Sequence, residues 1–130
     1  MEIWILSGLI LKHFLADFVL QREYQYANKG RYGHPGGLLH SGIHALGSII
    51  VLSFFLPFNL VLMLAGAEGV IHYHIDWAKS NLNKIMHLRV TEDNRYWFWF
   101  GFDQFLHHMT YIALILVIRE ILEQTPSIIG

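Results

Sequence analysis

Three ionisable residues follow one another at four-residue intervals in the otherwise apolar segment EGVIHYHIDWAK, which spans residues 68–79. They are Glu68, His72 and Asp76. Side chains four residues apart lie on one face of an α-helix, so these three form a single stripe. Imidazole and carboxylate groups gathered on one stripe are typical of metal ligands and of proton relays.

The same spacing recurs in three other apolar segments, so each of the four segments carries a pair of ionisable residues four positions apart. Two of these pairs lie at the C-terminal ends of the first and third segments, and two lie at the N-terminal ends of the second and fourth. If consecutive segments run in opposite directions, all four ends reach the same level of one bundle. The sequence therefore predicts a single site built from His13 and Asp17, His40 and His44, His72 and Asp76, and Asp103 and His107.

The composition of the chain places these segments in a membrane. The chain has 130 residues, of which 54% are hydrophobic and 15% are charged, and its mean hydropathy is +0.38. An ordinary soluble domain of this length is less apolar. The net charge of -1 indicates no partnership with nucleic acid. The lack of cysteine excludes disulfides, thiolate metal sites and thiol nucleophiles.

Four segments are each close to the roughly 20 residues that a helix needs to cross a bilayer. Lys12, His13 and Asp17 interrupt the first one, and no basic leader precedes it, so we expect it to be retained as a membrane span. We predict an all-α fold, namely an up-down-up-down bundle of four transmembrane helices that forms a single integral membrane domain over residues 1–130. The predicted spans are 3–21, 36–56, 58–79 and 101–122.

The distribution of basic residues predicts an orientation. Lys and Arg gather at or in the two long links, whereas the opposite face has only Arg119. The positive-inside rule then places the long links in the cytoplasm and both termini outside. Tyr96, Trp97 and Trp99 fit an interfacial aromatic belt. The TEDN segment at Thr91 fits equally well the cap of a fourth helix that starts early.

The acidic groups within the spans need partners. A carboxylate at the centre of a membrane helix costs roughly 2.5–3.5 kcal/mol, so Asp17, Glu68, Asp76 and Asp103 cost on the order of 10 kcal/mol when unpaired. One or two divalent ions would offset most of this cost, and mixed nitrogen and oxygen donors suit zinc, manganese or iron. The alternative is a metal-free network of His and carboxylate groups. The expected metal ligands are His13, Asp17, His40, His44, His72, Asp76, Asp103 and His107.

Glu68, one turn deeper than His72, has three interpretations. It is a bridging ligand, a general base that activates a metal-bound water, or the ion-pair partner of Lys12, which lies at a similar depth. We treat Glu68 as the candidate catalytic residue and leave all three open. Ser48 is interpreted as a helix-packing residue. The residues expected to surround and orient the ligands are Lys12, Gln21, Lys79, Gln104 and His108.

Four stretches of the sequence resemble the blocks of a known family. KHFLADFVLQ, LLHSGIHAL, IHYHIDWAK and FDQFLHH, which begin at residues 12, 38, 71 and 102, look like those of the bacterial domain-of-unknown-function family numbered 3307. This resemblance implies a small integral membrane protein of the bacterial inner (cytoplasmic) membrane. HSGIHAL and HYHID are also similar to the His-rich blocks of bacterial membrane-bound metal-dependent hydrolases, although Ser41 replaces the basic residue there. That likeness implies phosphoester or other hydrolytic chemistry.

These observations favour a metal-dependent membrane hydrolase that acts on a lipid or another amphiphilic substrate. One alternative is a non-catalytic role, in metal or proton transport or as an accessory subunit with a polar core. Another is a membrane-bound iron oxygenase, whose His pairs also lie on helices. The expected partners are the lipid bilayer and, because Gly42, Gly47, Gly66 and Gly69 allow close helix packing, a second copy of the chain in a homo-oligomer.

Overall fold

The computed structural model describes residues 1–124, and over these residues it is all-helical, without strands. This confirms the predicted fold class. A π-helical segment, η1, continues the first helix directly, and a single-turn helix, α2, precedes the second long one. The elements are α1 (Glu2–Phe14), η1 (Leu15–Leu20), α2 (Glu23–Tyr26), α3 (Pro35–Ser53), α4 (Phe58–Ile85) and α5 (Asn94–Gln124).

Four helical stretches within the described residues are long and apolar enough to cross a bilayer. They are α1 together with η1 (Glu2–Leu20), α3, α4 and α5. The first two have 19 residues each, close to the length of a membrane span, whereas α4 has 28 and α5 has 31. The chain therefore has the helices of a multi-pass membrane protein, and the two longest of them exceed the thickness of the hydrocarbon core.

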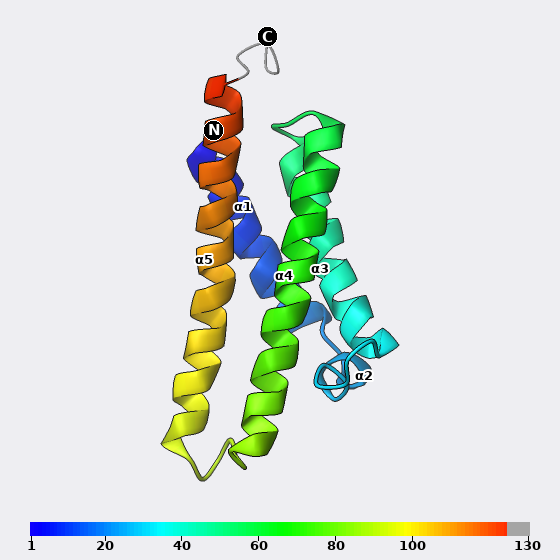
Figure 1. Ribbon diagram of the computed structural model, residues 1–130, viewed down its shortest axis with the longest axis vertical. Coiled ribbons are helices and arrows are strands. Elements are labelled where there is room, and N and C mark those ends of the chain that lie inside the picture. The colour runs from blue at the N-terminus through cyan, green and yellow to red at the C-terminus, as the bar shows by residue number, and fades with distance from the viewer. Residues whose placement is uncertain (125–130) are drawn as a thin grey trace.

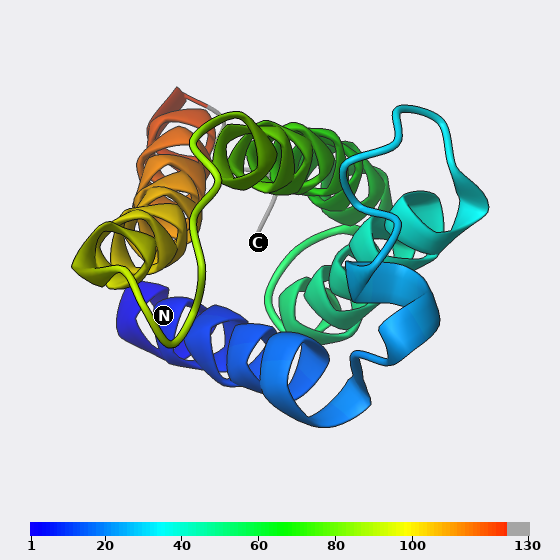
Figure 2. The same ribbon diagram turned by 90° about the horizontal axis from the view of Figure 1, so that it is seen from below.

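The four long helices surround a common interior. Helix α3 packs against α1 and α4, and α5 packs against α4 and α1. The view along the bundle shows this ring of helices, with α2 outside it beside α3 (Figure 2). The connection between α3 and α4 lies at the same end as the N-terminus and the end of α5, whereas α2 and the α4–α5 link lie at the other end (Figure 1).

The helix boundaries differ from those of the predicted spans. Helix α4 continues to Ile85, beyond the predicted end at 79, and α5 begins at Asn94, ahead of the predicted start at 101. The early start follows from a local cap, because the Asp93 carboxylate accepts a hydrogen bond of 2.8 Å from the backbone N–H of Arg95. The hydrogen-bonded Arg95 guanidinium also lowers the pKa of the Asp93 carboxyl from its usual value. Of the two interpretations of the TEDN segment, the structure has the early helix.

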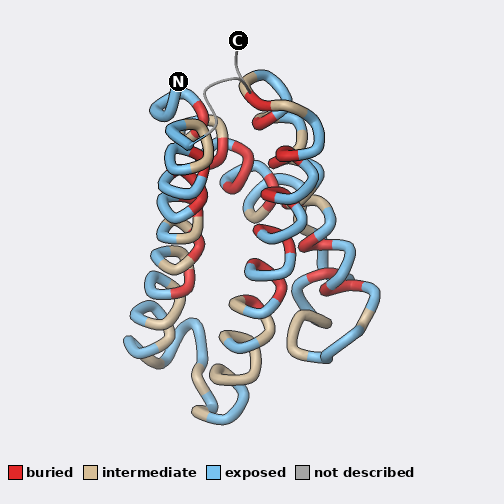
Figure 3. The backbone as a smooth tube through the Cα atoms, turned by 45° about the horizontal axis from the view of Figure 1, so that its top comes forward, coloured by how far each residue is buried: buried red, intermediate tan, exposed pale blue. Residues whose placement is uncertain are grey.

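Buried residues follow the helix faces that point toward one another (Figure 3). At the end of the bundle that carries the N-terminus and the α3–α4 connection, the interior is an apolar cluster. This cluster includes Ile5, Leu9, Leu52, Leu60, Val61 and Ile118. Toward α2 and the α4–α5 link, the interior contains buried imidazole and carboxylate groups instead. The bundle is thus divided along its length into an apolar half and a polar half.

Candidate metal centre

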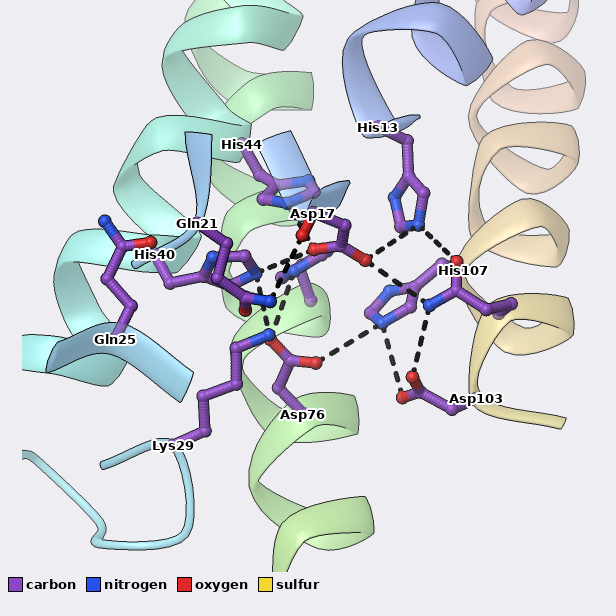
Figure 4. Close-up of polar contacts among 12 residues, drawn as sticks. His13, Asp17, Gln21, Gln25, Lys29, His40, His44, Asp76, Asp103 and His107 are labelled. Carbon is purple, nitrogen blue, oxygen red and sulfur yellow. Dashed lines mark hydrogen bonds and ion pairs between the residues drawn. The ribbon is translucent and has the colours of Figure 1, made fainter. Parts of the chain in front are cut away.

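All eight predicted ligand residues gather in the polar half of the bundle. Five elements supply them: α1 and η1 contribute one residue each, and α3, α4 and α5 contribute two each. Seven of the eight residues are buried, and the side chain of Asp17 is only 8% exposed. Most of these side chains are seen converging in Figure 4. They form three overlapping groups in which the possible ligand atoms lie within 4.8 Å of one another: Asp17, His40, His44 and His72; His13, His72 and His107; and Asp76, Asp103 and His107.

The π-helical segment η1 carries Asp17, which lies at the centre of the first group. Its Oδ1 is 3.0 Å from His40 Nε2 and 3.2 Å from His44 Nε2. Its Oδ2 is 3.2 Å from His13 Nε2. Short π-helical segments occur often at functional sites because the wider turn redirects a side chain. Asp17 therefore joins the imidazoles of α1 and α3 through its two oxygens.

Asp76 has the corresponding place on α4. Its Oδ2 lies 3.3 Å from the Nε2 atoms of both His40 and His72, and its Oδ1 lies 3.6 Å from His107 Nε2. His107 Nε2 is also 3.5 Å from Oδ1 of Asp103, one turn earlier on α5. The imidazole rings of His72 and His107 stack with their centroids 4.1 Å apart. Asp76 thus links the imidazoles of α3, α4 and α5.

Many polar atoms of this cluster lack hydrogen-bond partners. Within the described part of the chain, both ring nitrogens of His40 and of His72, Nε2 of His107 and Oδ1 of Asp103 are buried without a well-directed hydrogen bond. Each such atom costs about 1–3 kcal/mol when it is left unsatisfied. Nitrogen and carboxylate lone pairs without donors are the groups that coordinate a metal ion. Bonds of about 2.0–2.2 Å place opposite ligands at most about 4.4 Å apart, so small side-chain shifts would complete a coordination shell.

Glu68 faces a different set of partners. Its Oε1 lies 2.9 Å from Nζ of Lys12, and its Oε2 accepts a hydrogen bond of 3.2 Å from the Ser48 hydroxyl. Glu68 is outside the three ligand groups found among the described residues. Of the three interpretations of Glu68, its contacts favour the ion pair with Lys12. Its catalytic role stays a prediction.

Lys12 connects this ion pair to the ligand cluster. Its ammonium donates to the backbone carbonyl of His44 at 3.2 Å and lies 3.4 Å from His44 Nδ1. The second contact fits the tautomer in which His44 carries its proton on Nε2, from which it donates to Asp17. Coordination of a metal through Nε2 requires the other tautomer, so ion binding and the direction of the Lys12 hydrogen bonds are coupled at His44.

The other residues expected around the ligands differ in their contacts. Gln104 bridges the cluster, because its amide nitrogen donates to Asp17 and Asp103 at 3.3 Å and its oxygen accepts from His13 at 3.0 Å. Gln21 donates to the backbone carbonyl of Asp17. The Lys79 ammonium lies 3.7 Å from Asp103 Oδ2. His108 contacts the ring of His13 at a centroid distance of 5.5 Å.

Sequence reasoning missed three polar residues at the site. Tyr111, whose hydroxyl lies 2.8 Å from His13 Nδ1, and Ser48 each continue a predicted stripe by four residues, so the same spacing could have found them. Lys29 carries no such signal. It lies in the loop after α2, and its ammonium is 2.9 Å from Oδ2 of Asp76. Only the tertiary structure brings this loop against α4.

Helices of this length around a buried His and carboxylate cluster define a membrane-type helical bundle with a candidate metal centre. The chain matches the model of the family DUF3307, described as "Protein of unknown function (DUF3307)", over residues 5–129, and it belongs to that family. This match confirms the first resemblance noted from the sequence. No curated protein and no solved structure matches the chain significantly. The likeness to membrane-bound hydrolases therefore remains a hypothesis.

Proposed function

We propose that the protein is a metal-dependent membrane hydrolase that acts on a lipid or another amphiphilic substrate. The observation that carries this proposal is the convergence of eight His and Asp side chains, several with buried lone pairs that have no hydrogen-bond partner in the described chain. Divalent ions held by such donors lower the pKa of a coordinated water and polarise a substrate oxygen.

The arrangement of the ligands supports two ions rather than one. The first group, around Asp17, and the third group, around Asp103, share no residue, so each can bind an ion at the same time. Asp17 and Asp76 each direct their two oxygens toward different imidazoles, which is the placement of a bridging carboxylate. We assign Gln104 the role of orienting Asp17 and His13 through its hydrogen bonds.

The position of the cluster favours hydrolysis over ion transport. Between the cluster and the opposite end of the bundle lie the Lys12–Glu68 ion pair and then the apolar cluster around Ile5, Leu9 and Val61. Translocation of an ion or a proton needs polar groups along a path through the bilayer. Among the described residues that form this apolar cluster, Tyr111 supplies the one polar group, its hydroxyl. A reaction at one side of the membrane fits this asymmetry better.

Metal analysis of the detergent-purified protein tests the proposal first. Inductively coupled plasma mass spectrometry should find one or two zinc, manganese or iron ions per chain, and His72→Ala or Asp76→Ala should lose them. Asp76→Asn preserves the shape of the side chain and should lose metal with the helical content unchanged. The matched control is His74→Ala, because His74 lies on the same helix but bonds to Val70 and Tyr32 outside the cluster. A correctly folded wild type without metal contradicts the proposal.

Activity assays then separate the candidate reactions. A hydrolase should release product from a phosphoester amphiphile, lose activity with a chelator and regain it when the metal is restored. Iron content together with oxygen consumption points instead to an oxygenase. Flux of Zn2+ or H+ into liposomes that Asp17→Asn abolishes indicates transport, and it overturns the hydrolase assignment if no hydrolysis accompanies it.

A further inference from the structure

A long apolar groove follows the contact between α4 and α5. It consists of two adjoining cavities of about 520 and 590 Å3, which share Ile71, Ile75 and Leu106. On α4 the lining extends from Met63 to Leu82, roughly 28 Å of helix at 1.5 Å per residue. This length is close to the hydrocarbon thickness of a bilayer.

The groove lies on an outer face of the bundle, where a membrane-spanning protein meets lipid. Met63 and Val70 on α4 and Phe102 on α5 line it and are exposed. Small side chains create its depth, with Ala67 and Ala78 on α4 and Ala113 on α5. A concave, apolar surface of this length has the shape and chemistry to hold one acyl chain.

One end of the groove reaches the candidate metal centre through Lys79. The side chain of Lys79 lines the groove and is 22% exposed. Its ammonium lies 3.7 Å from Oδ2 of Asp103 and 5.1 Å from the centre of the Phe100 ring. Asp103 belongs to the ligand group that contains Asp76 and His107. A molecule in the groove therefore has its polar end beside the ligand cluster.

The charges at this end favour an anion. Lys79 is paired with Asp103, and Lys29 is paired with Asp76. When the two carboxylates bind a divalent ion, they no longer neutralise the two ammonium groups, and the region becomes positively charged. A phosphate beside Lys79, the lysine that lines the groove, would compensate part of this charge with charge-assisted hydrogen bonds.

We propose that the groove between α4 and α5 binds an acyl chain of a phospholipid and that Lys79 binds its phosphate, so that the polar end of the lipid reaches the Asp76, Asp103 and His107 group. This inference rests on the proposed function for the reaction that follows, but the binding itself requires no turnover. It names the substrate class as a phosphate-bearing membrane lipid.

Native mass spectrometry of the purified protein with added lipids tests the binding. The probes are dioleoyl phosphatidylglycerol, dioleoylglycerol, which has the same chains without phosphate, and glycerol phosphate, which has no chains. The wild type should bind the phospholipid about tenfold more tightly than dioleoylglycerol, as expected for one charge-assisted contact, and should not retain glycerol phosphate. Lys79→Met should remove that tenfold preference and leave binding of dioleoylglycerol unchanged.

Variants that fill the groove test the place of the acyl chain. Ala67→Phe and Ala78→Phe should weaken the binding of both lipids, whereas Leu116→Phe, at an exposed position of α5 that is not among the residues lining the groove, should not. Equal effects of the three variants, or equal binding of the two lipids by the wild type, overturn the inference. If light scattering shows that Ala67→Phe or Ala78→Phe changes the oligomeric state while lipid binding stays the same, the groove is a contact with a second copy of the chain. That result also overturns the inference.

Running these measurements on metal-loaded and chelator-treated protein keeps the two proposals apart. Lipid binding that is sensitive to Lys79→Met in a protein that purifies without metal and takes up no added zinc, manganese or iron supports the lipid site and contradicts the hydrolase. A metal-loaded protein that hydrolyses a soluble phosphoester but shows no preference for the phospholipid supports the hydrolase and contradicts the lipid site.

Discussion

Lys12 and Glu68 form an ion pair in which the two side chains are 8% and 1% exposed. Removing one partner of such a pair leaves an uncompensated buried charge. We therefore expect Glu68→Ala to lower the free energy of unfolding by about 3–5 kcal/mol. The double variant Lys12→Met with Glu68→Leu should recover most of that loss, because it removes both charges and keeps the volume similar.

Chemical denaturation in detergent micelles, followed by circular dichroism, measures both effects. Metal content and turnover of the double variant then decide the role of Glu68. A stable double variant that retains its metal and hydrolyses substrate shows that Glu68 is structural. If it retains its metal but loses turnover with KM unchanged, Glu68 is the general base after all.

Lys29 competes with a metal ion for Asp76. Its ammonium lies 2.9 Å from Oδ2 of Asp76, an atom that a bound ion would also use. Lys29→Met should therefore raise the affinity for a divalent ion by about tenfold, since a unit charge within about 5 Å at an effective dielectric constant of 20 repels a cation by more than 1.4 kcal/mol. Competition with a chromophoric chelator measures this affinity.

Lys84→Met is the matched control for Lys29→Met. Lys84 lies near the same loop, beside Gly30, and is absent from the ion pairs found among residues 1–124. Its replacement should leave the metal affinity unchanged. A tighter affinity in both variants would show that only the overall charge of the face matters, and a weaker affinity in Lys29→Met would show that Lys29 supports the ligand instead of competing with it.

The candidate site contains residues on helix stripes and a residue from a loop, and the sequence could predict only the first kind. His72 and Asp76 could be paired in advance because the helical repeat fixes which side chains share a face. The partners across the bundle followed from the shared level of four helix ends. Lys29 could not be predicted, because its position depends on how the loop after α2 returns to α4. The contact of Glu68 with Lys12 was one of three alternatives, and only packing distances favour it.

At the scale of the elements, the contact between α2 and the start of α3 depends on a glycine. A Cβ on Gly36 would overlap with the backbone carbonyl oxygen of Tyr24 and would lie 3.1 Å from Cβ of Asn28. A backbone oxygen cannot rotate away as a flexible side chain can, so the two elements would have to separate. Gly36→Ala should destabilise the protein by about 1–3 kcal/mol.

Gly42→Ala, on the same helix, provides the comparison. A Cβ at Gly42 would meet nothing within 4 Å in the described structure, and alanine favours a helix by up to about 1 kcal/mol over glycine. Thermal unfolding in detergent should therefore show a lower midpoint for Gly36→Ala and an equal or higher midpoint for Gly42→Ala. Similar losses in both variants would mean that the loop packing around Gly36 contributes little to stability.

Sequence patterns predicted the positions of the long helices better than their boundaries. Apolar composition located the four long helices because a bilayer demands about 20 apolar residues in succession. It did not locate the start of α5, since the hydrogen bond from Arg95 to Asp93 caps that helix ahead of the aromatic segment YWFWF. Composition also does not distinguish the π-helical segment η1, which carries Asp17, from the apolar α-helix before it.

At the scale of the whole molecule, the division of the interior into a polar and an apolar half places the candidate metal centre toward one end of the bundle. Seven of the nine Lys and Arg residues lie in or near the α2 loop and the α4–α5 link, and these two segments lie at the same end of the bundle (Figure 1). The positive-inside rule therefore predicts that the centre opens toward the cytoplasm. Lys29 and Lys79, which contact the ligand carboxylates, are two of the residues behind that prediction.

Single-cysteine labelling tests this orientation, because the chain contains no cysteine of its own. Glu92→Cys lies in the α4–α5 link and Asn59→Cys near the start of α4, at the opposite end, and both positions are exposed. In intact spheroplasts, a membrane-impermeant maleimide should label Asn59→Cys at once and Glu92→Cys only after permeabilisation. Leu64→Cys, buried in the apolar cluster, should stay unlabelled in both conditions and shows that labelling reports exposure. Labelling of Glu92→Cys in intact spheroplasts would place the centre outside, where its substrate would have to come from the outer leaflet.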